Sequence, residues 1–244
     1  MRKLLSGVRP NRRQVFMAGA VVAASTVAAT ETAAAGGYGS GDLGAWKGLT
    51  KAVATEATIQ RVLTAGGVFM FGDSLGVQDG KALSLRMMSK LNLDLAVNNW
   101  SGRPTKDTVD ELAKWKASYG LPRRILMSCG TNDIFTPPAM AAQIDRAMSI
   151  VGTRSTVFWV NTQVARTGMG TTLQLADQRN SAWVNIQLAD AQRRYPNLRI
   201  VRWAEWLAAK PTRLGTYLRL GIHTSIPYGQ DARNELIVQA IKAG

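Results

Sequence analysis

Residues 68–75 read Val68-Phe69-Met70-Phe71-Gly72-Asp73-Ser74-Leu75, an apolar run of strand length followed by a glycine, an acid and a serine. A glycine permits a tight turn, so the pattern predicts a strand that turns directly into a helix. Ser74 is expected at this junction, with its hydroxyl facing a cleft above a helix N-terminus. An alternative is that Asp73 or Ser74 only caps the helix, because both residue types are favoured at that position.

Other apolar runs of strand length follow at Leu93–Val97, Ile125–Cys129, Val157–Val160 and Leu198–Val201. Helical spacing of apolar residues is found between them, in Thr105–Tyr119 and Pro137–Val151, and a last helix is expected at about Tyr228–Ala243. Near-continuous apolar strands separated by helices are typical of a parallel sheet covered on both faces. The sequence therefore predicts an α/β protein, with a three-layer α/β/α fold of the flavodoxin-like kind and a five-stranded parallel sheet.

The amino-terminal residues 1–35 have the parts of an export signal, because basic residues precede the apolar run Val15–Ala29 and a stretch of small residues. The pair Arg12-Arg13 is similar to a twin-arginine signal, and Ala33-Ala34-Ala35 offers a cleavage site. An uncleaved membrane anchor is the alternative, although the run is shorter than the ~20 apolar residues that span a bilayer. We therefore expect an exported protein, extracellular or associated with the cell envelope.

The rest of the chain is expected to hold one domain, over residues 67–244. Residues 36–66 are expected to form a flexible leader and an amino-terminal helix, because Gly36–Gly44 has the composition of a flexible linker. A domain of about 200 residues is large enough to bury most of its apolar surface in a single core.

The chain is strongly basic, with 30 Lys and Arg against 16 Asp and Glu and a net charge of +14. Residues 1–35 hold five of the basic residues and one acid, so 25 basic and 15 acidic residues leave +10 on the remainder. A basic domain tends to stay near polyanions. Since the basic residues are scattered and form no nucleic-acid-binding motif, we expect an anionic envelope surface as a partner and no specific nucleic acid.

Cysteine and histidine are each present once, as Cys129 and His223. An intramolecular disulfide is therefore impossible, and Cys129 is expected to be a small buried hydrophobe at the end of an apolar run. One histidine and one distant cysteine provide no ligand cluster, so no metal site is expected. The sequence implies no cofactor.

Polar loops follow the second and third predicted strands, where an α/β sheet binds its ligands. Asn98–Arg103 contains Gly102, whose backbone N–H could approach a ligand, and Gly130–Asp133 presents the side-chain amide of Asn132. Together with Ser74, these loops deliver a hydroxyl, a backbone donor and an amide donor to one edge of the sheet. Such a set suits acyl transfer, because the donors can stabilise the oxyanion that forms when an ester carbonyl is attacked.

A serine nucleophile also needs a base that takes its proton. His223 lies in Arg219–Ser225, a loop ahead of the last predicted helix, which this order of elements also places at the carboxyl edge. We therefore expect His223 to be the general base rather than a structural histidine.

The blocks Gly72-Asp73-Ser74-Leu75, Gly102, Gly130-Thr131-Asn132-Asp133 and Gly221-Ile222-His223 resemble, in this order, those of the SGNH (GDSL-like) hydrolases. The resemblance spans about residues 67–242 and is greatest to the small SGNH domains that bacteria secrete or attach to membrane acyltransferases. It implies Ser74 as nucleophile and His223 as base. It also implies an oxyanion hole formed by the backbone N–H groups of Ser74 and Gly102 and by the Asn132 side chain.

Position 220 departs from that resemblance, because the family usually has Asp three residues before the histidine and this chain has Leu220. In serine hydrolases the acid orients the imidazole, and its loss in serine proteases costs about 10⁴ in turnover. Three alternatives stay open: a backbone carbonyl near Leu220 accepts from the ring, Asp133 or Asp231 substitutes for the acid, or activity is low.

Three functions are compatible with these residues. The first is a secreted carboxylic-ester hydrolase that acts on a small acyl ester or an O-acylated envelope polysaccharide through an acyl-serine intermediate. The second is a cell-envelope O-acyltransferase that uses the same site, and the third is a non-catalytic carbohydrate- or envelope-binding module on the same fold. Retention of Ser74, Asn132 and His223 favours catalysis, whereas Leu220 favours the binding module.

Overall fold

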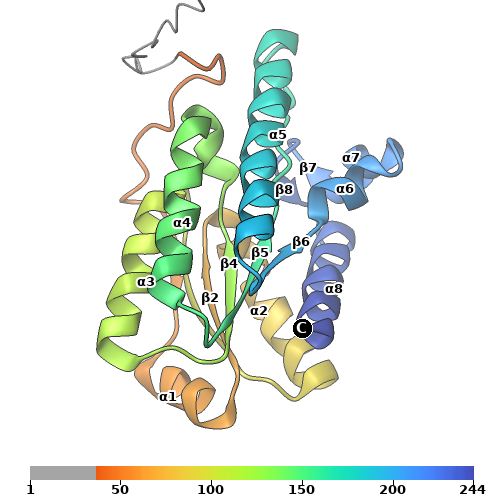
Figure 1. Ribbon diagram of the computed structural model, residues 1–244. Coiled ribbons are helices and arrows are strands. Elements are labelled where there is room, and N and C mark those ends of the chain that lie inside the picture. The colour runs from red at the N-terminus through yellow and green to blue at the C-terminus, as the bar shows by residue number, and fades with distance from the viewer. Residues whose placement is uncertain (1–36) are drawn as a thin grey trace, which may run out of the picture. The chain divides into compact units, whose positions relative to one another are not determined.

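The computed structural model describes residues 37–244, and its centre is a six-stranded sheet in the order β1-β3-β2-β4-β5-β6 (Figure 1). Strands β2 to β6 are mutually parallel, whereas β1 pairs antiparallel with β3 at one edge. The strands are β1 Lys51–Val53, β2 Val68–Gly72, β3 Leu95–Trp100, β4 Arg124–Ser128, β5 Thr156–Val160 and β6 Leu198–Val201. A separate hairpin is formed by β7 Leu218–Arg219 and β8 His223–Thr224.

Helices cover both faces of the sheet, as the sequence predicts. The α-helices are α1 Glu56–Ala65, α2 Ser74–Leu91, α3 Thr105–Tyr119, α4 Met140–Val151, α5 Thr171–Arg194, α6 Trp203–Ala208, α7 Thr212–Tyr217 and α8 Tyr228–Ala243. Two short 3₁₀ helices, η1 Thr131–Phe135 and η2 Pro137–Ala139, precede α4. Within residues 37–244, no helix combines the length and the apolar character needed to cross a membrane.

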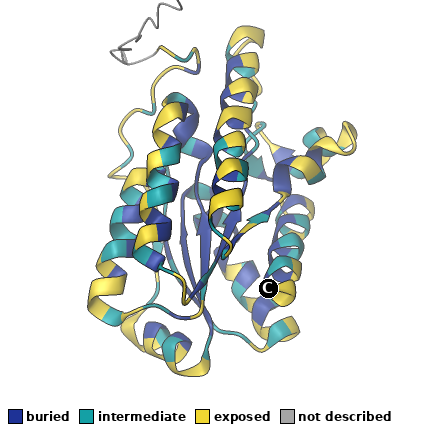
Figure 2. Cartoon of the chain, in the orientation of Figure 1, coloured by how far each residue is buried: buried dark blue, intermediate teal, exposed yellow. Residues whose placement is uncertain are grey.

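Alternating side chains of the strands divide the core into two apolar layers. In β2, Phe69 and Phe71 join the layer that contains residues of α1, α3, α4 and α5, whereas Val68 and Met70 join the layer formed with α2, α6 and α8. All four side chains are fully buried. Figure 2 shows the resulting buried sheet between helices whose outer faces are exposed. The predicted three-layer α/β/α fold is therefore confirmed.

The predicted strand number was wrong, because β1 adds a sixth, antiparallel strand. This edge strand has three residues and carries an exposed Val53, so it shows no apolar run that sequence analysis could detect. The predicted strand Leu93–Val97 is also shifted, since β3 continues through Asn98 and Asn99 to Trp100. Both asparagines are buried, so polar residues extend a strand that hydropathy alone predicts to end earlier.

The segment ahead of β1 packs against the domain. Ser40 is 1% exposed, its hydroxyl accepts a 2.8 Å hydrogen bond from the Asn180 amide, and its carbonyl accepts from Arg166. Tyr38 contacts Trp183 edge to face at 5.9 Å. The segment predicted as a flexible leader therefore holds residues with defined partners, and the predicted export signal lies outside the described residues.

Candidate active site

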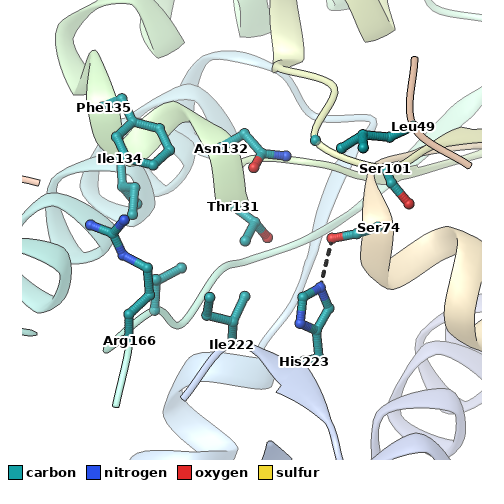
Figure 3. A pocket seen from close by; sticks show the side chains of 12 residues that line it. Leu49, Ser74, Ser101, Thr131, Asn132, Ile134, Phe135, Arg166, Ile222 and His223 are labelled. Atoms are coloured by element: carbon teal, nitrogen blue, oxygen red, sulfur yellow. Dashed lines mark hydrogen bonds between the residues drawn. The ribbon is translucent and has the colours of Figure 1, made fainter. Parts of the chain in front are cut away.

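The candidate nucleophile and base are in direct contact. Helix α2 begins at Ser74, immediately after β2, and the Asp73 side chain caps it by accepting a 3.0 Å hydrogen bond from the Leu75 amide. Because Asp73 acts as the cap, the Ser74 hydroxyl is free, and its Oγ lies 3.0 Å from His223 Nε2 (Figure 3). Asp73 therefore caps the helix, as the alternative allowed, and this leaves Ser74 available for chemistry.

His223 is presented by the short hairpin of β7 and β8. The turn between these strands contains Gly221 at φ +69°, where an added Cβ would lie 1.8 Å from the Ala165 carbonyl oxygen. Burial, followed by the nearby charge of Arg219, lowers the pKa of His223 below its ordinary value of 6.5. The imidazole is therefore neutral at pH 7 and can accept a proton from Ser74.

The predicted oxyanion donors lie at the same cavity, which has a volume of about 340 Å³ and is lined by Ser74, Gly102, Asn132 and His223 among others. Gly102 follows β3 at φ +74°, and an added Cβ would lie 2.7 Å from Trp46 Cβ. Figure 3 shows the Asn132 amide nitrogen on the side of the cavity that holds Ser74. The amide donates at 3.2 Å to the Arg103 carbonyl and has a second N–H for a ligand.

The remaining wall of the cavity is largely apolar. It is formed by Leu49, Ile134, Phe135, Val164 and Ile222. Arg166 also lines the cavity, and its guanidinium is held by Asp177 at 2.7 Å and lies 5.1 Å from the Phe135 ring. The apolar part of a ligand bound next to Ser74 would therefore be removed from water in this cavity.

A buried cation supports the loops beneath the site. Arg103 is 1% exposed and donates at 2.7 Å to Asn98 Oδ1, at 2.8 Å to the Gly72 carbonyl and also to the Asn98 carbonyl. Burial lowers the pKa of Arg103. Because Gly72 precedes Asp73-Ser74 and Asn98 belongs to β3, this side chain connects the ends of the two strands that lead to Ser74 and Gly102.

Comparison with known proteins shows this fold in several solved structures, although no family model and no curated protein matches the sequence. The chain superposes on a GDSL-like lipase of Bacteroides thetaiotaomicron with a TM-score of 0.58 and 16% identity, over 77% of this chain and 98% of that one. It superposes on an SGNH hydrolase of Slackia heliotrinireducens with a TM-score of 0.57 and 17% identity, over 71% and 97%. The chain has the SGNH hydrolase fold.

A third similar structure is the C-terminal catalytic domain of peptidoglycan O-acetyltransferase A from Streptococcus pneumoniae. The TM-score is 0.57 at 13% identity, over 72% of this chain and 93% of that domain. Hydrolytic and acyl-transferring proteins thus share this SGNH fold. At these identities the likeness concerns the fold, so the roles of individual residues depend on the geometry of this chain.

The acids suggested as substitutes at this site make no hydrogen bond to His223. Asp133 is buried and accepts from the Thr105 hydroxyl at 2.7 Å, and burial raises its pKa to about 6. Asp231 lies on the surface and pairs with Arg86 at 2.5 Å. The suggestion that either acid orients His223 was therefore wrong, because other elements already hold each carboxylate.

The carbonyl suggested near Leu220 also has another partner. The Leu220 carbonyl accepts a 3.2 Å hydrogen bond from the Thr167 amide, and the Gly221 carbonyl accepts one of 2.9 Å from the Ala165 amide. Leu220 itself is 64% exposed at φ +54°. Within the described part of the chain, no hydrogen bond to Nδ1 of His223 is found.

Sequence analysis missed several cavity residues, among them Arg166 and Leu49. Arg166 follows β5, so the rule that ligands lie beyond the strand ends could have indicated it. Leu49 precedes β1 in the predicted leader, and no sequence signal marked it. Cys129 is buried, as predicted, and burial raises the pKa of its thiol. Over residues 37–244, no group of three or more His, Cys, Asp or Glu side chains is placed to hold a metal ion.

Proposed function

We propose that this protein is an exported serine esterase that hydrolyses an acyl ester through an acyl-Ser74 intermediate. The observation that carries the proposal is the 3.0 Å contact between Ser74 Oγ and His223 Nε2 at a cavity that Gly102 and Asn132 also line. Nucleophile, base and donors come from four separate segments of the chain. Their convergence on one cavity is the arrangement that acyl transfer requires.

The proposed reaction has two steps. His223 Nε2 takes the Ser74 proton while Oγ attacks the ester carbonyl carbon, and the oxyanion accepts hydrogen bonds from the backbone N–H groups of Ser74 and Gly102 and from the Asn132 amide. When the tetrahedral intermediate breaks down, the imidazolium gives its proton to the departing alcohol oxygen. Water, deprotonated by His223, then attacks the acyl-Ser74 carbonyl, and the bond to Oγ breaks as the imidazolium returns this proton to Oγ. The carboxylic acid is released, and Ser74 and neutral His223 are restored.

The apolar cavity wall supports an apolar acyl group as the part of the substrate bound beside Ser74. Side chains such as Ile134, Phe135 and Val164 offer no charged partner for that group, and they remove it from water. The alcohol part would leave towards solvent. The charge of +10 outside residues 1–35 supports an anionic cell envelope as the place where the exported enzyme works.

A cell-envelope O-acyltransferase is the second candidate, and the similarity to the peptidoglycan O-acetyltransferase domain favours it. Its first step is the same acylation of Ser74. In the second step a sugar hydroxyl replaces water and receives the acyl group. The two functions therefore differ in the acceptor, which reacts after the alcohol has left.

Hydrolysis of p-nitrophenyl butyrate tests the proposal directly, with Ser74→Ala compared with the wild type and with Ser84→Ala, a control on the same helix. We expect Ser74→Ala to lose activity while keeping the wild-type melting curve, and Ser84→Ala to retain it. An active Ser74→Ala would contradict the proposed nucleophile. Adding a soluble peptidoglycan fragment as acceptor distinguishes the two candidates, because a transferase forms the acylated sugar faster than free butyrate.

A further inference from the structure

Helix α2 contacts the catalytic hairpin through Asp79 as well as through Ser74. Asp79 is fully buried (0% exposed), and its Oδ1 accepts a 2.8 Å hydrogen bond from the hydroxyl of Thr224, which is also buried. Thr224 is the residue directly after His223 in β8. The element that carries the proposed nucleophile thus also holds the side chain of the residue next to the proposed base.

The neighbouring Gln78 adds a second connection to the same hairpin. Its Nε2 donates at 3.0 Å to the Thr224 carbonyl and at 2.5 Å to the Thr224 hydroxyl. Its Oε1 accepts from Arg219 Nη2 at 3.0 Å, and Arg219 is the register partner of His223 in β7. Gln78 therefore bonds to both strands of the hairpin beside His223.

Helix α8 contacts the Asp79 carboxylate in turn, and strand β4 contacts the arginine that pairs with it. Arg233 Nη1 lies 3.4 Å from Asp79 Oδ2, and its Nη2 donates at 2.7 Å to the Ser128 hydroxyl. Gln230 Nε2 lies 3.4 Å from Asp79 Oδ1. A buried carboxylate with partners on three sides has little freedom to move, so it can define the position of Thr224.

We propose that Gln78 and Asp79 are positioning residues for His223, which they hold through Thr224 in place of a carboxylate on the imidazole ring. This inference rests on the proposed function. It explains how the His223 imidazole keeps Nε2 at 3.0 Å from Ser74 Oγ with Leu220 in the usual acidic position and with no acceptor at Nδ1 among residues 37–244. The contacts are made to the backbone carbonyl and the hydroxyl of Thr224. They therefore fix the position of the backbone from which the His223 side chain projects.

The charge of Asp79 also affects the pKa of His223. The charged groups that act on His223 are Arg219 of β7, which lowers its pKa, and Asp79 of α2, which raises it, while burial lowers it more than either. Arg233 of α8 faces Asp79. The Asp79 carboxylate therefore favours the imidazolium that forms during attack, although it does not touch the ring.

Substitution of Thr224 separates positioning from general support of the fold. Thr224→Val removes the hydroxyl and keeps the shape, and we expect kcat on p-nitrophenyl butyrate to fall about 10- to 100-fold with KM within about twofold, the effect of misplacing a catalytic group. Thr224→Ser restores the hydroxyl and should restore most of kcat. Ser155→Ala is the matched control, because it removes a buried hydroxyl bonded at 2.7 Å to the Pro122 carbonyl, and its kcat should equal that of the wild type.

Asp79→Asn tests the charge. The acid limb of kcat/KM should move to lower pH, because the imidazolium loses a nearby anion and keeps Arg219 and Arg233, whereas Thr224→Val should leave the limb in place. Gln78→Met removes a half-buried amide and provides a variant that is easier to fold. It should lower kcat severalfold.

Two kinds of result overturn the inference, and they are distinguishable. A wild type that neither hydrolyses esters nor reacts with a fluorophosphonate at Ser74 removes the proposed function, and the positioning role is lost with it. An active wild type with folded Thr224→Val and Gln78→Met variants of unchanged kcat contradicts the positioning role alone. If Thr224→Val does not fold, the kcat of Gln78→Met and the acid limb of Asp79→Asn decide.

Discussion

Replacement of the buried Arg103 by methionine is expected to weaken both the fold and the site. The substitution keeps an apolar chain of similar length and removes the guanidinium, which donates to Asn98 Oδ1, the Asn98 carbonyl and the Gly72 carbonyl. An unpaired buried acceptor costs roughly 1–3 kcal/mol, so three cost roughly 3–9 kcal/mol. Relief of guanidinium desolvation offsets several kcal/mol of this, which leaves a loss of about 2–5 kcal/mol in the free energy of unfolding.

Urea denaturation and ester hydrolysis measure the two effects. A domain of this kind has a total stability of about 5–15 kcal/mol, so Arg103→Met should still fold, with a lower urea midpoint at an unchanged m-value. Its kcat should fall, because the ends of the strands that lead to Ser74 and Gly102 lose their connection. Arg146→Met, which breaks the half-exposed pair with Asp110, is the control and should cost at most about 1 kcal/mol. Equal stability and kcat of Arg103→Met and the wild type would show that the guanidinium supports neither the fold nor the site.

Three further predictions concern Asn132, His223 and position 220. Asn132→Ala should lower kcat by about 10²–10³ with little change in KM, as removal of one oxyanion donor does; a loss confined to KM would show that Asn132 only binds the ground state. The wild-type kcat/KM should have its acid limb below pH 6.5, because His223 must be neutral to act and its pKa is lowered; a limb above that value would contradict the burial effect. Leu220→Asp should raise kcat and move this limb to higher pH, because the new carboxylate favours the imidazolium. Stability should be unchanged, since the position is 64% exposed and Asp tolerates a left-handed backbone better than Leu. An unmoved limb would show that the carboxylate does not reach the ring.

The parallel strands and the helices between them could be predicted because each leaves a periodic signal. Val68–Phe71 and Val157–Val160 are continuous apolar runs, and Thr105–Tyr119 shows helical spacing over the length that the structure confirms. The edge strand β1 leaves no such signal, because it is short and partly exposed. Asn98 and Asn99 extend β3 against their hydropathy, since their burial depends on partners such as Arg103 that only the folded chain brings near.

The site was predictable where a residue stands at a strand end and carries its own chemistry. Ser74 and Asn132 satisfy both conditions, whereas His223 was predicted from its chemistry and from its loop ahead of the last helix. The structure places all three at one cavity. What supports His223 was not predictable, since Asp79 lies 144 positions earlier in the chain and acts through Thr224 rather than on the ring. Leu49 belongs to the predicted leader, and it reaches the cavity because the segment from Tyr38 to Val53 packs along the domain.

Reaction with a fluorophosphonate, followed by peptide mapping, shows whether Ser74 is a nucleophile activated by His223. We expect one covalent adduct on the peptide that contains Ser74, formed rapidly in the wild type and lost or strongly slowed in His223→Ala at the same pH. Absence of an adduct in the folded wild type, or an adduct on another serine, would contradict this role of Ser74.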